Sequence, residues 1–171
     1  MTSSAMITID DVRAAGSAIR QAIADADGPL PPAFLIEFLL SEWRRYLVYL
    51  HHQHGVDSAP WASVVDVTRR LLLSVLPLGD ADQRSLVSQG LLRLVGEVRV
   101  GIAVAGMADA ASERFLGELR AVHLALLNAP EPAAASLIDL SQTFAVNTLD
   151  PRYRALLDRL DGLDSVEHIN M

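Results

Sequence analysis

The sequence contains no cysteine, so the chain can form neither a disulfide bond nor a metal site built from thiolates. This composition suits a reducing compartment, and we expect a cytoplasmic location. Long apolar runs are also missing. The longest, FLIEFLL and VGIAVAGMA, are far shorter than the ~18 residues that a membrane-spanning helix requires. The opening residues MTSSAMITIDDV lack a basic stretch followed by an apolar core, so we expect no signal peptide.

Positive charge is scarce as well. The chain has 14 basic and 21 acidic residues, which gives a formal net charge of -7, and the acidic residues are spread out rather than run together. Broad binding to nucleic acid or to an anionic membrane needs a basic face. We therefore expect neither nucleic acid nor a membrane as a partner.

Signals of β-structure are missing too, because no alternating apolar runs are joined by Asn-Gly or Asp-Gly turns. Apolar residues recur at helical spacing almost throughout. We predict an all-α fold: an antiparallel bundle of about five main helices with a short extra C-terminal helix. Residues 1–129 would form the bundle. Residues 130–171 would form a linker and a short helical tail that packs on the bundle or on a partner.

Capping residues, prolines and glycines place the helix ends. The predicted helices span about residues 8–28, 32–54, 58–77, 80–106 and 150–160, and a fifth main helix carries the apolar stripe between residues 115 and 127. In the fourth helix we interpret Gly96 and Gly101 as points of close backbone approach. Its apolar residues form a bundle seam of Val87, Leu91, Leu94, Val98, Ile102 and Ala105. Leu73 falls on the polar side of the third helix, an unusual place for a leucine.

The second helix carries two apolar faces, which is more than a simple surface helix needs. One of them is a stripe formed by Phe34, Phe38, Arg45 and Tyr49. Aromatic residues beside an arginine are enriched at interface hot spots, so this stripe is a candidate protein interface. Packing inside the chain, against the first or the last helix, is the alternative.

Three of the five histidines lie within four positions at the end of the second helix, in WRRYLVYLHHQHGVDSAPW. His51 and His54 have a spacing that can bind zinc, but no third ligand accompanies them. We interpret the group as a polar helix end, where the side chains meet the negative end of the helix dipole. We expect no metal and no cofactor.

Candidate ligand-binding residues are Arg44, Arg45 and His123. The two arginines can hold a phosphate or carboxylate, but neighbouring helix residues point about 100° apart, so surface charge is the simpler interpretation. His123 lies on an apolar helix edge, where a buried structural histidine is common. We find no nucleophile motif, glycine-rich phosphate loop or carboxylate pair suited to acid–base catalysis, and we predict no catalytic residues.

Four stretches together resemble a known family: PPAFLIEFLLSEWRRYL, HGVDSAPW, RLLLSVLPLGDADQRSLV and ERFLGELRAVHLALL. They are similar to domain-of-unknown-function family 1631, a bacterial family whose members are usually long cytoplasmic proteins, some loosely labelled thymidine phosphorylase. The resemblance covers about residues 32–128. Its shared positions are Pro32, Trp43, Gly55, Ser58, Trp61, Ser74, Val75, Pro77, Phe115, Leu119 and His123.

The resemblance implies no catalytic residues, because the family has none established. The label of thymidine phosphorylase has no support in this sequence, because we find no glycine-rich phosphate loop and no basic pocket. These patterns favour a non-enzymatic helical interaction or scaffold module, whose partner is a protein or a second copy of the chain. The alternative is a sensor that holds a nucleotide or metabolite between helices near Arg44, Arg45 and His123.

Overall fold

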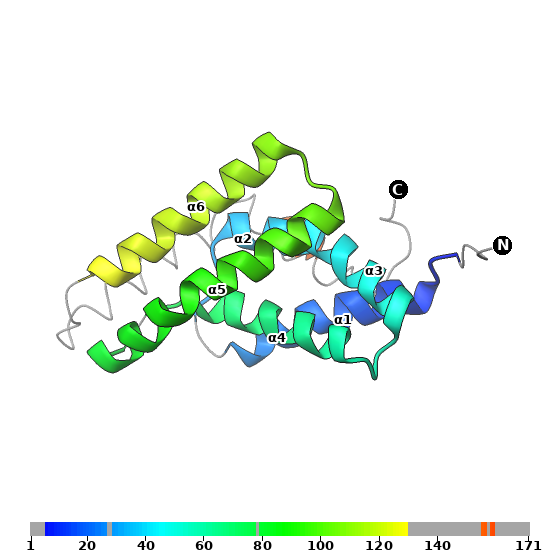
Figure 1. Ribbon diagram of the computed structural model, residues 1–171, viewed down its shortest axis with the longest axis horizontal. Coiled ribbons are helices and arrows are strands. Elements are labelled where there is room, and N and C mark those ends of the chain that lie inside the picture. Colours follow the sequence, from blue (N-terminus) through cyan, green and yellow to red (C-terminus); the bar gives the residue numbers. More distant parts are fainter. Residues whose placement is uncertain (1–5, 27–28, 78, 130–154, 157, 160–171) are drawn as a thin grey trace.

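The computed structural model describes residues 6–26, 29–77, 79–129, 155–156 and 158–159 (Figure 1). In that part of the chain every regular element is a helix, which confirms the prediction of an all-α bundle. The five expected main helices are α1 (Ile9–Asp25), the continuous unit α2–η1–α3 (Ala33–Phe38, Leu39–Trp43 and Arg44–His54), α4 (Ala59–Leu73), α5 (Ala81–Ala105) and α6 (Asp109–Asn128).

Four helix ends lie where the capping signals placed them, while α1 and α4 end a few residues earlier than expected, at Asp25 and Leu73. Thr8 and Asp11 form the expected capping box at the start of α1. Ser58 and Asp80 each accept a hydrogen bond from a backbone amide in the first turn of α4 and α5. Gly106 ends α5 in the left-handed conformation, with φ of 69°, which glycine adopts without steric cost.

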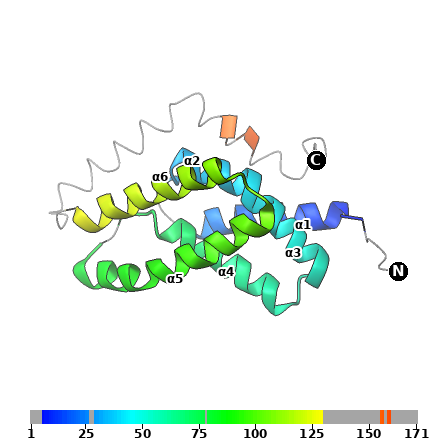
Figure 2. The same cartoon turned by 45° about the horizontal axis from the view of Figure 1, so that its top comes forward.

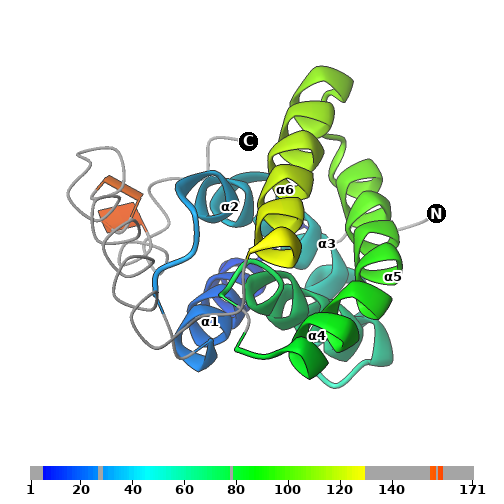
Figure 3. The ribbon, with the colours of Figure 1, turned by 90° about the vertical axis from the view of Figure 1, so that its left-hand side faces the viewer.

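The helices pack around one shared hydrophobic core. α1 packs against α3 and α4, and α5 contacts α3, α4 and η1. α6 returns across α2, so the two lie side by side in each view (Figures 1, 2 and 3). Within the described ranges, no helix is both long enough and apolar enough to cross a membrane.

The second helix contains a π-helical turn, η1, that the sequence pattern did not predict. A π-turn holds more residues than an α-turn and changes the direction of the side chains that follow. Ser41 lies in this turn, and its hydroxyl donates a 2.7 Å hydrogen bond to the carbonyl of Glu37. Trp43 ends the turn and is 1% exposed.

Gly101 of α5 packs directly against the rings of Trp43 and Tyr46. A Cβ atom at this position would clash with Trp43 and lie 2.8 Å from two ring carbons of Tyr46. The close approach that we expected is therefore present at Gly101. It is absent at Gly96, where an added Cβ would have nothing within 4 Å.

One residue of the predicted tail lies in the core. Leu156 is 4% exposed and belongs to the main hydrophobic cluster, and residues 155–156 and 158–159 are helical. The linker predicted after residue 129 and the rest of the last helix lie outside the described residues. The division into residues 1–129 and 130–171 stays a prediction.

The contrast between the two glycines of α5 gives a test of the packing. Gly96→Ala should raise the free energy of unfolding by up to about 1 kcal/mol, because alanine favours a helix and the site is open. Gly101→Ala should lower it by about 2 kcal/mol relative to Gly96→Ala, because Trp43 and Tyr46 must shift. Urea unfolding measures both. Equal stabilisation by the two changes would contradict the packing at Gly101.

Candidate functional site

Two of the three clustered histidines bind one buried carboxylate. Nδ1 of His51 lies 2.7 Å from Oδ1 of Asp11, and Nδ1 of His52 lies 3.0 Å from Oδ2. An ionised carboxylate only accepts hydrogen bonds, so both imidazoles donate from Nδ1. His54 is exposed and takes no part in this cluster. The histidines therefore join the end of α3 to the start of α1, which the sequence analysis missed.

The Asp11 carboxylate is held in its charged form. Burial raises the pKa of Asp11, but hydrogen bonds from Thr8, His51 and His52 lower it, and the net pKa lies well below the ordinary 3.8. Among the described residues no group of three or more histidine, aspartate or glutamate side chains is arranged to hold a metal ion. The cluster fixes one helix to another.

Ser74 and His123 form a second buried pair, between the end of α4 and α6. Nε2 of His123 lies 2.9 Å from Oγ of Ser74, and that hydroxyl donates a 2.7 Å hydrogen bond to the carbonyl of Leu71. With the hydroxyl proton directed to the Leu71 carbonyl, the Nε2–H tautomer of His123 is the one that completes the pair by donating to Oγ of Ser74.

The structure places the three candidate ligand-binding residues on two helices, α3 and α6. Arg44 is half-buried, and Arg45 is exposed and pairs with Glu42 in the preceding turn. His123 is 6% exposed, lies on α6 and is bonded to Ser74. The ligand site expected around these three residues stays a prediction, and Arg45 and His123 are each already bonded to another side chain of the protein.

The aromatic stripe of the second helix is divided between core and surface. Phe38 is 4% exposed and stacks on Phe115 of α6, with ring centroids 3.8 Å apart. Phe34 also packs on Phe115, at 5.9 Å. Both phenylalanines therefore pack inside the chain, which was the alternative interpretation. The helix that they contact is α6, whereas we expected the first helix or the short C-terminal one. Arg45 and Tyr49 remain exposed.

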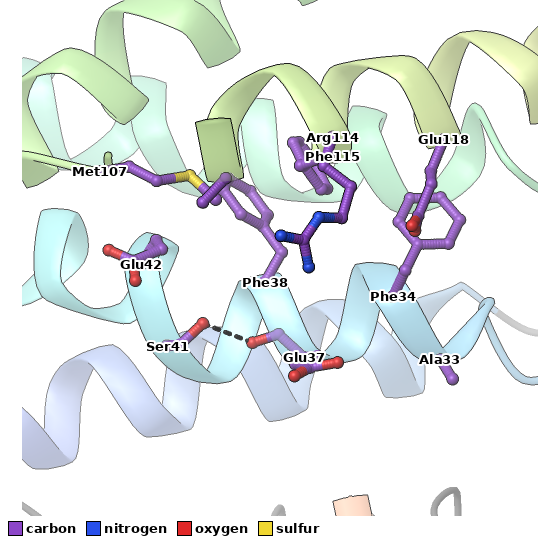
Figure 4. Close-up of a pocket in the computed structure, with 11 residues that line it drawn as sticks. Ala33, Phe34, Glu37, Phe38, Ser41, Glu42, Met107, Arg114, Phe115 and Glu118 are labelled. Atoms are coloured by element: carbon purple, nitrogen blue, oxygen red, sulfur yellow. Dashed lines mark hydrogen bonds between the residues drawn. The ribbon is translucent and has the colours of Figure 1, made fainter. Parts of the chain in front are cut away.

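A pocket of about 300 Å³ lies between α2–η1 and α6 (Figure 4). Its apolar wall comes from aromatic rings and Met107, and its rim carries charged side chains from both helices. The residues that line it are Ala33, Phe34, Glu37, Phe38, Ser41, Glu42, Met107, Ala111, Arg114, Phe115 and Glu118. The sequence analysis named the two phenylalanines but not the pocket, which depends on where α6 lies.

A second hollow, which we call the α4–α5 groove, lies where α4 ends and α5 begins. It has a volume of about 260 Å³ and mostly apolar walls. The residues that line it are Arg70, Leu73, Ser74, Leu86, Val87, Gly90, Leu91 and Leu94. The guanidinium of Arg70 is paired with Asp66 and Glu97, each at 2.7 Å, so its charge is balanced. The groove suits an apolar occupant.

Comparison with known proteins identifies the family. A model described as "Protein of unknown function (DUF1631) third domain" matches residues 11–120. The chain belongs to this family. No curated protein and no solved structure matches the chain. The match confirms the resemblance seen in the sequence and extends it into α1, so that it includes Asp11.

The positions that carry the DUF1631 resemblance are largely packing residues. Trp43 donates a 2.8 Å hydrogen bond to Thr68, and Trp61 packs edge-on against His51. Ser74 and His123, from two separate motifs, bond to each other. His123 lies just beyond the matched residues. The residues of these motifs therefore hold helices of the bundle together.

The Asp11 cluster should give the protein a defined acid response. The ionised carboxylate stabilises the fold above the unfolded pKa of about 3.9, and this stabilisation is lost as the pH falls toward the lower folded pKa. Asp11→Asn should cost about 2 kcal/mol at pH 7 and progressively less below pH ~4. Unfolding by urea across this range measures it, with Asp10→Asn as the exposed control. If the loss of unfolding free energy in Asp11→Asn stayed the same below pH ~4, the ionised carboxylate would not be the stabilising group.

Burial lowers the pKa of His123 below 6.5, which predicts a second pH response. Below about pH 6.5 the unfolded chain takes up a proton that the folded chain resists, so His123 reduces stability as the pH falls. His123→Gln keeps a donor for Ser74 and should flatten the dependence of unfolding free energy on pH between about 7 and 5. The exposed His54→Gln is the control. An unchanged slope in His123→Gln would show that this imidazole does not resist protonation.

Proposed function

We propose that the chain is a non-enzymatic interaction module whose partner, at the α4–α5 groove, is a second copy of itself. The observation that supports this proposal is the α4–α5 groove, together with the exposed side chain of Leu86 beside it. Leu86 is 71% exposed and Leu73 is 50% exposed, yet both line an apolar hollow rather than a polar surface. Contiguous apolar surface of this kind is typical of a protein contact.

The apolar seam of α5 continues beyond the part that the chain covers. Leu94, Val98 and Ile102 are buried. Val87 and Leu91 belong to the same predicted seam but are only half-buried, and they line the groove. A seam that one molecule covers only in part leaves a site that another helix face can cover.

A second copy fits because the same short region offers both a projection and a hollow. In a two-fold dimer each patch contacts its own counterpart, so Leu86 of one molecule can enter the groove of the other, and the reverse. Gly90 supports this arrangement, since nothing lies within 4 Å of a Cβ built there and its side of α5 is open to a close approach. The balanced charge of Arg70 leaves no unpaired ion in the contact.

Light scattering coupled to size exclusion tests the proposal. The wild-type chain should be a dimer at high micromolar concentration, and Leu86→Glu should make it a folded monomer, because two carboxylates would be buried in the contact. Leu92→Glu is a matched control: Leu92 is 88% exposed on the same helix, but it faces about 160° away from Leu94 of the groove.

The Leu92→Glu variant should remain dimeric. A wild-type chain that stays monomeric at all concentrations would overturn the self-association. Dissociation by Leu92→Glu with no effect of Leu86→Glu would place the contact on the other side of α5 and would contradict the groove as the interface.

A further inference from the structure

The pocket between α2–η1 and α6 joins an aromatic wall to charged groups of both signs. Phe34, Phe38 and Phe115 pack against one another along its wall. Figure 4 shows Arg114 reaching from α6 toward α2, and Glu118 lying above the ring of Phe34. The pocket therefore presents a cation, an anion and an apolar surface within a volume of about 300 Å³.

The exposed side chains of Arg114 and Glu118 are one helical turn apart on α6, yet in the described part of the chain neither side chain has a hydrogen bond or an ion pair. Charged neighbours at this spacing often pair with each other. Here both line the pocket instead. Glu42, on the opposite rim, is already engaged by Arg45. Arg114 and Glu118 are the two charges on the α6 side that a bound molecule can use.

We propose that this pocket binds a free amino acid with an apolar side chain. The guanidinium of Arg114 would take the α-carboxylate, which it can bind through two parallel hydrogen bonds. The carboxylate of Glu118 would accept hydrogen bonds from the α-ammonium group. The apolar side chain would lie on Phe34, whose ring is half-buried at the pocket wall.

The size and charge of the pocket select this class of ligand. Its volume lies at the lower limit of about 300 Å³ for ligand pockets, so it suits a small molecule. A simple anion bound to Arg114 would meet the carboxylate of Glu118 one turn along α6, and a simple cation bound to Glu118 would meet Arg114. A molecule with adjacent charges of opposite sign matches both groups on α6, and the aromatic wall favours an apolar side chain.

The π-turn helps to form the other rim. Ser41 and Glu42 belong to η1 and line the pocket, and the hydroxyl of Ser41 is fixed by its bond to the Glu37 carbonyl. π-turns inside helices occur frequently at functional sites. Across the pocket, the stacking of Phe38 on Phe115 holds α6 at its distance from α2. Both walls of the site are thus formed before a ligand arrives.

Isothermal titration calorimetry with L-leucine tests the proposal on the wild-type chain. Isoamylamine lacks the carboxylate and 4-methylpentanoate lacks the ammonium group, so each should bind at least about tenfold more weakly than leucine. This comparison needs no variant and is independent of any effect on folding. Failure to detect leucine binding at about 10 mM, or equal binding of isoamylamine, would overturn the proposal.

Matched variants on α6 test the two contacts. Arg114→Gln and Glu118→Gln should each weaken leucine binding about tenfold or more, because each removes one charged partner. Arg120→Gln and Glu113→Gln change exposed residues of the same helix outside the pocket, and they should bind leucine as the wild type does. Retained binding in Arg114→Gln and Glu118→Gln would place the ligand elsewhere and overturn the assignment.

This ligand site goes beyond the proposed self-association and does not depend on it. Leu86 lies in the α4–α5 groove and outside the pocket. Leu86→Glu should therefore bind leucine as the wild type does, whatever its oligomeric state. A loss of leucine binding in that variant would contradict the separation of the two sites.

Discussion

Trp43 is the point at which three helical units meet, and the rest of the bundle depends on it. Its indole N–H donates a 2.8 Å hydrogen bond to Thr68 of α4, whose own hydroxyl donates to the Val64 carbonyl at 2.7 Å. Every polar atom in this chain of bonds has a partner, so a fully buried tryptophan and threonine carry no unsatisfied group. The other side of the ring lies against Gly101 of α5.

This junction explains why the chain buries only part of the length of α5. From Leu94 to Ile102 the helix is buried against η1, α3 and α4, and Gly101 allows the closest contact. Nearer its start, α5 extends past the core, and Val87 and Leu91 are only half-covered. The same helix that meets Trp43 thereby leaves the α4–α5 groove open at its other end.

Phe38 extends the same aromatic cluster to α6. Its ring lies 5.6 Å from that of Trp43 and stacks on Phe115, which fixes α6 beside α2. The charged side chains of Arg114 and Glu118 then stand over an aromatic wall. The pocket and the groove are therefore two consequences of one packing arrangement, and they lie on different elements of the bundle.

The fold was largely predictable from the sequence because its determinants are local. Thr8 and Asp80 are N-cap residues that mark helix starts, and Gly106 is a C-cap residue that marks an end. Helical periodicity identifies the buried faces. The sites were not predictable in the same way. Asp11 and His51 are 40 residues apart, and Ser74 and His123 are 49 apart, so no local pattern reports that they meet.

Some sequence signals pointed toward a site without identifying it. The unusual position of Leu73 on a polar helix face is explained by the groove, where it lies beside α5. Phe34 and Phe38 were recognised as a distinctive stripe, but whether they face a partner or the core depended on the position of α6. The π-turn has the same apolar spacing as an ordinary helix, which is why periodicity did not reveal it.

Amide hydrogen exchange along α5, recorded at about 5 and about 500 μM protein, tests the central claim that this helix is covered by its own chain at one end and by a partner at the other. The amides from Val98 to Ile102 should be strongly protected at both concentrations, because the Trp43 junction covers them. The amides from Leu86 to Leu91 should gain protection only as the concentration rises. Exchange at Leu86 to Leu91 that is independent of concentration would contradict the account, because no second molecule would then cover the groove.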